Sequence, residues 1–139
     1  MPDLDAARAS LLDQLFAAFN RHDAAAVMAC MTQDIVFDGA AGPELHGRRF
    51  TGTAEVAAAF ERTWTDFPDV SWECTRHAMF GDRGLSEWIF RATTKDGTRI
   101  EAAGCDLFGF RDGLICSKSA FRKDRPLQPA LAAKEAASS

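Results

Sequence analysis

The chain has 139 residues, of which 47% are hydrophobic and 26% are charged, as in an ordinary globular protein of one domain. Its formal net charge of −4 argues against a surface for nucleic acid or an anionic membrane, because both need clustered Lys and Arg. No apolar stretch approaches the roughly 20 residues that span a bilayer, and the acidic first residues lack the layout of a signal peptide. We therefore expect a cytoplasmic protein that contacts neither membranes nor nucleic acid.

Four cysteines are spread along the chain without a CxxC pair or a histidine at metal-ligand spacing. This spacing predicts free thiols and no metal site. The sequence also contains no tyrosine, although it has 11 phenylalanines and three tryptophans. The cysteines are Cys30, Cys74, Cys105 and Cys116.

The first half of the chain is predicted to be mostly helical. Apolar residues recur at three- and four-residue spacing between Leu4 and Phe19, which predicts an amphipathic helix. Asp23 is placed to cap a second helix, and Thr53 a third, which Pro68 ends. The expected elements are helices over residues 4–19, 24–31 and 54–67, a strand over 34–38 and a loop over 40–52.

The second half is predicted to form strands over residues 70–80, 85–94, 99–110 and 114–123. Two Asp-Gly pairs between them tolerate the positive φ that tight hairpin turns need. Early helices followed by a meander of strands predict an α+β fold, in which three N-terminal helices pack on a curved antiparallel sheet and enclose a pocket. We expect one domain over residues 1–125 and an Ala-rich tail over 126–139.

The strand predicted over residues 99–110 places a carboxylate on an apolar face. Alternation puts Asp106 on the same side as Gly104 and Phe108. An unpaired carboxylate there is costly as an anion, so burial raises its pKa and favours a neutral hydrogen-bond donor or a base that works near neutral pH. An equally good interpretation is that backbone N–H groups at a bulge near Gly104, or a nearby Arg or Lys, satisfy Asp106.

Several segments, taken in order, resemble one family. They are the helix–helix–strand opening, Gly-Cys-Asp-Leu-Phe-Gly-Phe over residues 104–110, Asp-Gly-Leu-Ile over 112–115 and Ser-Lys-Ser-Ala-Phe-Arg-Lys over 117–123. Together they resemble the nuclear transport factor 2-like superfamily, in its SnoaL-like and ketosteroid isomerase-like branches, over roughly residues 8–125. The resemblance implies a cone-shaped α+β barrel with a mixed sheet around a pocket, and homodimers that pair through the outer face of the sheet.

The resemblance also implies roles for individual residues. In the isomerases a carboxylate at the end of the first strand shuttles the proton, and Asp38 falls there. A protonated aspartic acid later in the sheet donates to the developing oxyanion, and the SnoaL-like cyclases use an aspartate in about the same place; both nominate Asp106. Leu15 replaces the oxyanion tyrosine of the isomerases, and removing such a donor costs about 10²–10³ in rate. Ser119 replaces the last-strand aspartate of the limonene epoxide hydrolases, so that activity is not expected.

Other side chains are candidates for the pocket or for the surface. Glu87 shares one face of its strand with Arg91, and Trp88 lies on the opposite face. Alternation and the family alignment disagree on which of these faces lines the pocket, so the register stays open. We expect substrate contacts from Leu15, Phe60, Trp64, His77, Ser119 and Phe121, although the aromatic residues suit the hydrophobic core equally well. The basic residues near the end are expected to form a solvated face: Lys118, Arg122, Lys123 and Arg125.

Two functions of different classes follow from these residues. The first is an enzyme without metal or organic cofactor, in which Asp106, with Asp38 as a second carboxylate, transfers a proton next to the carbonyl of a small apolar molecule. Isomerisation, cyclisation and dehydration all belong to that chemistry. The alternative is a domain without catalysis that binds a ligand or serves as a dimerising scaffold, which the missing tyrosine favours.

Overall fold

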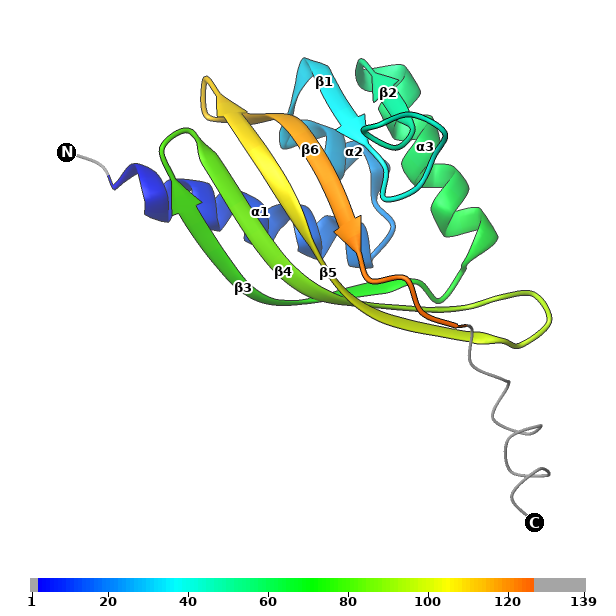
Figure 1. The fold of residues 1–139 in the computed structure, drawn as a ribbon. Helices are drawn as coiled ribbons and strands as arrows, with labels where there is room; N and C mark the ends of the chain where they lie inside the picture. The colour runs from blue at the N-terminus through cyan, green and yellow to red at the C-terminus, as the bar shows by residue number, and fades with distance from the viewer. Residues whose placement is uncertain (1–2, 127–139) are drawn as a thin grey trace.

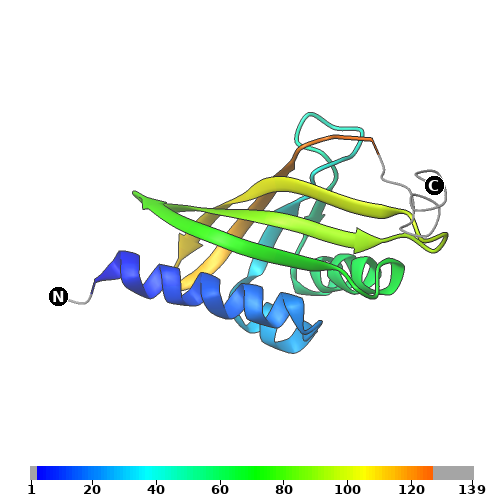
Figure 2. The same ribbon diagram turned by 90° about the horizontal axis from the view of Figure 1, so that it is seen from below.

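The computed structural model describes residues 3–126, so residues 127–139 of the predicted tail lie outside the described part. Within residues 3–126, three helices lie on the concave side of a six-stranded sheet (Figures 1 and 2). This is the α+β fold that the order of the elements predicts. The elements are α1 (Leu4–Asn20), α2 (Ala24–Ala29), β1 (Met31–Asp38), β2 (Arg49–Thr51), α3 (Thr53–Asp66), β3 (Ser71–Phe80), β4 (Arg83–Thr93), β5 (Arg99–Arg111) and β6 (Leu114–Arg122).

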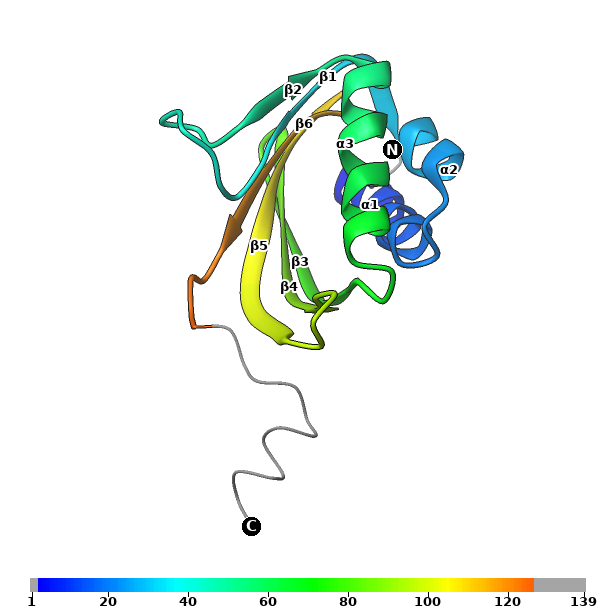
Figure 3. The same ribbon diagram turned by 90° about the vertical axis from the view of Figure 1, so that its right-hand side faces the viewer.

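The sheet is mixed and curved. Its strands lie in the order β2-β1-β6-β5-β4-β3, and every neighbouring pair is antiparallel except β1 and β6, which run parallel. Seen from the side, the sheet curves around α1 and α3 (Figure 3). Within the described residues β2 and β3 are its two edges and do not pair with each other. The predicted cone is therefore confirmed, but its wall is open rather than closed into a barrel.

Three differences between the predicted and the observed elements are informative. The second helix ends at Ala29, and Met31, expected on its buried face, begins β1 and is buried there. Residues 49–51 of the expected loop form β2, which is too short to show alternation in the sequence. Gly52 rather than Thr53 is the N-cap of α3. The backbone there has a φ of 86°, a conformation that favours glycine. The predicted cap at the other helix is confirmed, since the Asp23 side chain accepts from the backbone N–H of Ala26.

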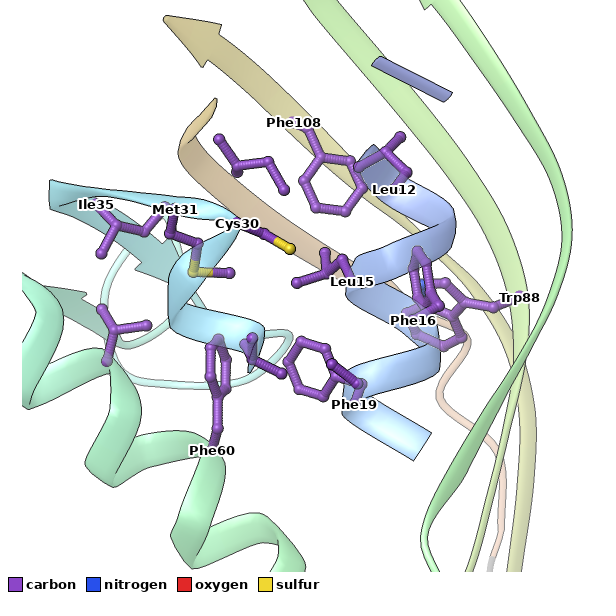
Figure 4. Close-up of a cluster of buried hydrophobic side chains, with 14 of the residues drawn as sticks. Leu12, Leu15, Phe16, Phe19, Cys30, Met31, Ile35, Phe60, Trp88 and Phe108 are labelled. Atoms are coloured by element: carbon purple, nitrogen blue, oxygen red, sulfur yellow. The ribbon is translucent and has the colours of Figure 1, made fainter. Parts of the chain in front are cut away.

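The hydrophobic core lies between α1 and the concave face of the sheet (Figure 4). Leu12, Leu15, Phe16 and Phe19 project from one side of α1, at the spacing that predicts the helix. Phe16 meets Phe108 of β5 edge to face, with ring centroids 6.4 Å apart. Burial of each such side chain stabilises the fold by roughly 1.5–3 kcal/mol. This packing fixes α1 against the strands that carry the site.

The burial pattern of β4 answers the question of its register. Trp88 and Phe90 are only 3% and 4% exposed, on the concave face. Glu87 and Arg91 instead form ion pairs with side chains of neighbouring strands on the outer face. Alternation within the strand therefore indicates the correct face, and the family alignment does not.

No helix within residues 3–126 is long and apolar enough to cross a membrane. The four cysteines are free thiols. In the same part of the chain, no three His, Cys, Asp or Glu side chains lie close enough together to hold a metal ion.

Candidate functional site

A cavity of about 320 Å³ lies between α3, the end of β1 and the concave face of the sheet. This volume is at the lower end of the range for small-molecule sites. Two buried charged side chains line it, Asp106 from β5 and Lys118 from β6. Much of the remaining wall is aromatic: Phe37, Phe50, Phe67, Trp72 and Phe90.

Asp106 and Lys118 form a buried ion pair beside this cavity. Asp106 is 1% exposed and Lys118 is 7% exposed, and Lys118 Nζ lies 3.3 Å from Asp106 Oδ1. Asp106 pairs with Ala120 across β5 and β6, so Lys118, two positions earlier on β6, lies on the same face. Of the partners left open by the sequence, a nearby lysine is therefore the one observed.

The surroundings of Asp106 change its acidity. Burial raises the pKa of its carboxyl above the ordinary value, and the positive charge of Lys118 and the indole of Trp88 only partly oppose this rise. A carboxyl with a raised pKa binds a proton more readily than one in water. Asp106 is therefore suited to take up and return a proton.

Three phenyl rings surround the amine of Lys118. Its Nζ lies 4.6 Å from the ring centroid of Phe37, 5.4 Å from that of Phe19 and 5.7 Å from that of Phe60. Ring faces attract a cation, so these contacts hold the charged end of Lys118 in place inside the protein. The prediction that Lys118 belongs to a solvated face is wrong.

A β-bulge in β6 decides which of its side chains reach the cavity. The pairing of β6 with β5 skips Cys116 and so leaves it as the extra residue. Because the bulge shifts the alternation by one position, Lys118 and Ala120 line the cavity, whereas Ser119 and Phe121 do not. The structure places Ser119 and Phe121 beside a separate hollow instead.

Trp88 of β4 covers another part of the cavity wall, close to Asp106. Its partner across β4 and β5 is Gly104, and a Cβ at that position would lie 2.5 Å from Cη2 of the indole. The register of β4 and β5 is regular through Gly104. The glycine therefore makes room for the indole rather than forming the bulge considered from the sequence.

Arginines line the exposed rim of the cavity. Arg48, Arg62 and Arg122 lie there with one carboxylate, Asp66. Arg122 Cζ is 4.5 Å from the ring centroid of Phe90, which is part of the cavity wall. Positive charges thus outnumber negative ones at the rim, which favours ligands that carry acceptor groups.

The sequence matches the family model of the SnoaL-like domain over residues 12–118. The chain belongs to the SnoaL-like domain family. The family and the fold together confirm the resemblance to the nuclear transport factor 2-like superfamily. No curated protein matches this SnoaL-like domain in sequence.

Solved structures share the fold of this SnoaL-like domain at low sequence identity. An NTF2-like protein of unknown function from Burkholderia pseudomallei K96243 is 19% identical, with a TM-score of 0.73 over 84% of this chain and 91% of that one. A protein with a ketosteroid isomerase-like fold from Catenulispora acidiphila, in complex with trimethylamine, is 19% identical, with a TM-score of 0.72 over 80% and 83%. TerC, co-crystallised with polyporic acid, is 16% identical, with a TM-score of 0.74 over 84% and 92%.

The SnoaL-like domain does not bring Asp38, the second predicted carboxylate, to the cavity. Phe37 lines the cavity, and Asp38, the next residue of β1, points to the opposite face. There Arg49 of β2 donates to both carboxylate oxygens, over 2.8 and 2.9 Å. The Arg49 guanidinium holds the pKa of Asp38 below its usual range, which is unfavourable for a base. Of the two predicted carboxylates, Asp106 is therefore the one that lies buried beside the cavity.

Three of the predicted lining residues belong to the hydrophobic core of this SnoaL-like domain. Leu15, Phe60 and Trp64 are 0%, 3% and 8% exposed, and the cavity wall does not include them. Leu15 and Phe60 point into the core between the helices and the sheet (Figure 4). Of the three, Phe60 contacts the site, through the cation of Lys118. These three side chains therefore pack the core rather than line the cavity.

His77, also predicted to line the pocket, lies outside it in a chain of hydrogen bonds. Its Nε2 is 2.7 Å from Asp13 Oδ1, and its Nδ1 is 2.8 Å from Ser86 Oγ. The order Ser-His-Asp is that of a nucleophilic triad, but Ser86 is fully buried and does not line the cavity. These hydrogen bonds therefore connect α1 to β3 and β4.

Proposed function

We propose that this SnoaL-like domain binds a small organic molecule with a carbonyl group in the cavity and that Asp106 transfers a proton on it. The observation that carries the proposal is a carboxyl that is 1% exposed, has a raised pKa and still borders a cavity of ligand size. A core carboxyl with a purely structural role needs no such cavity. The aromatic wall supports an apolar ligand body, and the arginine rim supports acceptor groups at its outer end.

Lys118 supports this chemistry by balancing charge. When ionised Asp106 takes a proton from the carbon next to a carbonyl, the negative charge moves to the carbonyl oxygen of the resulting enolate. The buried ammonium of Lys118, 3.3 Å from Asp106 Oδ1, faces a negative charge both before and after the transfer if that oxygen lies nearby. Return of the proton to another carbon completes an isomerisation, and no metal or organic cofactor takes part in these steps.

Solved relatives of the same fold support a ligand in the cavity. TerC was co-crystallised with polyporic acid, and the protein from Catenulispora acidiphila was in complex with trimethylamine. We draw from them that the fold accommodates small organic molecules.

Exchange of carbon-bound hydrogen tests the catalytic part of the proposal. 2-Tetralone, a small aromatic ketone with acidic C–H groups beside its carbonyl, is incubated with the protein in D2O and its deuteration is followed by NMR. The wild type should accelerate exchange, and Asp106→Asn should lower that rate by about 10²-fold or more, because a positioned acid/base contributes about 10²–10⁴. Asp82→Asn removes an exposed carboxylate in the turn between β3 and β4, away from the cavity, so it is the control and should keep the wild-type rate.

The second candidate function is ligand binding without catalysis. It is favoured by the ion pair itself, since Asp106 already has a partner in Lys118. Saturable binding of 2-tetralone with no accelerated exchange would support this alternative. Wild-type exchange rates in folded Asp106→Asn would exclude Asp106 as the acid/base.

We also propose that the domain forms a homodimer through the outer face of its sheet. Phe121 is 55% exposed there and borders a hollow of about 510 Å³ with apolar residues of β4 and β5. A second copy of the chain would cover this face.

A further inference from the structure

The indole N–H of Trp88 is buried without a hydrogen-bond acceptor. Trp88 is 3% exposed, and its Nε1 makes no hydrogen bond within residues 3–126. A buried donor left unpaired costs about 1–3 kcal/mol, so such groups are uncommon and call for a reason. The N–H lies near enough to Asp106 to lower the pKa of that carboxyl, but the contact does not reach hydrogen-bond geometry.

Position separates this donor from the other unpaired indole. Trp64 also has a buried Nε1 without a partner in the described residues, but it is packed in the core against the ring of His22. Trp88 instead lines the cavity, together with Asp106 and Lys118. The indole of Trp88 thus borders the same cavity as the two groups that the proposed function uses.

We propose that Trp88 donates the hydrogen bond of its Nε1–H to the carbonyl oxygen of the cavity ligand. This inference rests on the proposed function and names a further catalytic residue for it. As the C–H bond breaks, its proton goes to Asp106 and its electron pair forms the enolate double bond, while the carbonyl electrons move to the oxygen. Trp88 N–H and Lys118 Nζ then face that oxygen, and the reverse electron flow follows when Asp106 returns the proton.

Two features of the chain fit this role. The first is Gly104, which allows the indole to lie against β5 beside Asp106, because any Cβ there would overlap the ring. The second is the lack of tyrosine anywhere in the sequence, which leaves no phenol to serve as the donor. The ligand class that matches is a carbonyl compound able to form an enol, or a phenol, whose oxygen is a stable counterpart of the enolate oxygen.

Paired probes test the hydrogen bond without requiring turnover. p-Cresol and toluene have the same ring and methyl group, but p-cresol alone carries an oxygen. In ¹⁵N-labelled protein the three indole N–H signals are assigned with single Trp→Phe variants, and both probes are titrated. We expect p-cresol to shift the Trp88 signal far more than toluene does. In Trp88→Phe the ratio of p-cresol to toluene affinity should fall about tenfold, as for the loss of one hydrogen bond.

Two further variants keep the result interpretable. Trp64→Phe removes the other unpaired indole N–H and should leave the affinity ratio unchanged. Replacement of the Trp88 indole by benzothiophene keeps the ring shape and removes only the donor, so it serves where Trp88→Phe disturbs packing. An unchanged affinity ratio in the benzothiophene protein would overturn the inference.

The outcomes separate this inference from the proposed function. If 2-tetralone exchange fails but the affinity ratio falls, Trp88 is a ligand donor in a protein without catalysis. If exchange depends on Asp106 but neither probe distinguishes the Trp88 variants, the proposed function stands and the role of Trp88 is wrong. If both hold, the Trp88 variants should also slow exchange by about 10²-fold or more, as for the loss of one oxyanion donor.

Discussion

At the scale of single residues, the site depends on two opposite charges that the fold removes from water. Each charge makes the burial of the other tolerable, since an unpaired buried ion costs several kcal/mol. The phenyl rings of Phe19, Phe37 and Phe60 further stabilise Lys118. The pair is therefore both a structural element and the proposed proton-transfer group, and these two roles require different measurements.

Stability measurements isolate the structural role of the pair. Asp106→Asn leaves the ammonium of Lys118 buried without its partner and should lower the free energy of unfolding at neutral pH by about 3–5 kcal/mol. The double variant Asp106→Leu/Lys118→Met replaces both charges by apolar groups and should be at least as stable as the wild type. Urea denaturation measures all three proteins. A single variant as stable as the wild type would show that the pair contributes nothing in solution.

The acid limb of the pH–rate profile isolates the proposed catalytic role. The base is ionised Asp106, so kcat/KM is present above its pKa in the folded protein and is lost as the pH falls through that value. Burial raises this pKa, so the loss begins at a higher pH than the ~3.9 of a free aspartate predicts. Lys118→Met removes a positive charge that lowers the pKa, and the limb should move to still higher pH. A limb that stays in place, measured by 2-tetralone exchange, would contradict the assignment.

At the scale of elements, the contact between β4 and β5 shapes the site. Gly104 and Trp88 are partners across these strands, and the indole occupies the space where a side chain at position 104 would be. The bulge at Cys116 in β6 then turns Lys118 toward Asp106. The absence of a side chain at Gly104 thus makes room for Trp88 at the cavity wall. The extra residue at the bulge turns Lys118 toward Asp106 at the same wall.

Gly104→Ala tests the first of these devices. The added Cβ would lie 2.4 Å from the backbone oxygen of Phe121 and 2.5 Å from Cη2 of Trp88, so the strand or the indole must shift. We expect a loss of about 1–3 kcal/mol in the free energy of unfolding and a changed Trp fluorescence spectrum. Gly39→Ala is the control, because its nearest neighbour would be 3.6 Å away and its φ is ordinary. Equal stability of the two variants would argue against close packing at Gly104.

At the scale of the whole molecule, the two faces of the curved sheet differ in what they present. Helices and aromatic residues fill the concave side and leave the cavity, while the convex side carries charged pairs and the exposed ring of Phe121. An exposed aromatic ring over an apolar hollow is typical of an interface between proteins. The proposed dimer would use this convex side and leave the cavity free.

Light scattering tests the dimer at this scale. The wild type should have twice the chain mass of 15.2 kDa, and Phe121→Asp should have a mass near that of one chain, because a buried charge opposes association. Phe80→Asp is a matched control, since Phe80 is 53% exposed but does not border the outer hollow. A wild-type mass near 15.2 kDa would exclude the dimer under those conditions.

Periodicity in the sequence was sufficient for the fold class and for one residue of the site. The helical spacing of α1 and the alternation of β5 both predict the buried faces that the structure shows, and Asp106 lies on one of them. These patterns are local, so they can be recognised without knowing any neighbour. The short strand β2 has no such pattern and was missed for that reason.

Only the tertiary structure decided which side chains lie next to Asp106. Lys118 faces it because a bulge at Cys116 reverses the alternation of β6, and Asp38 faces away because it follows the inward-pointing Phe37. Trp88 joins the site through strand pairing across β4 and β5. Contacts between residues distant in sequence depend on strand register and on bulges, where a shift of one residue moves every later side chain to the opposite face.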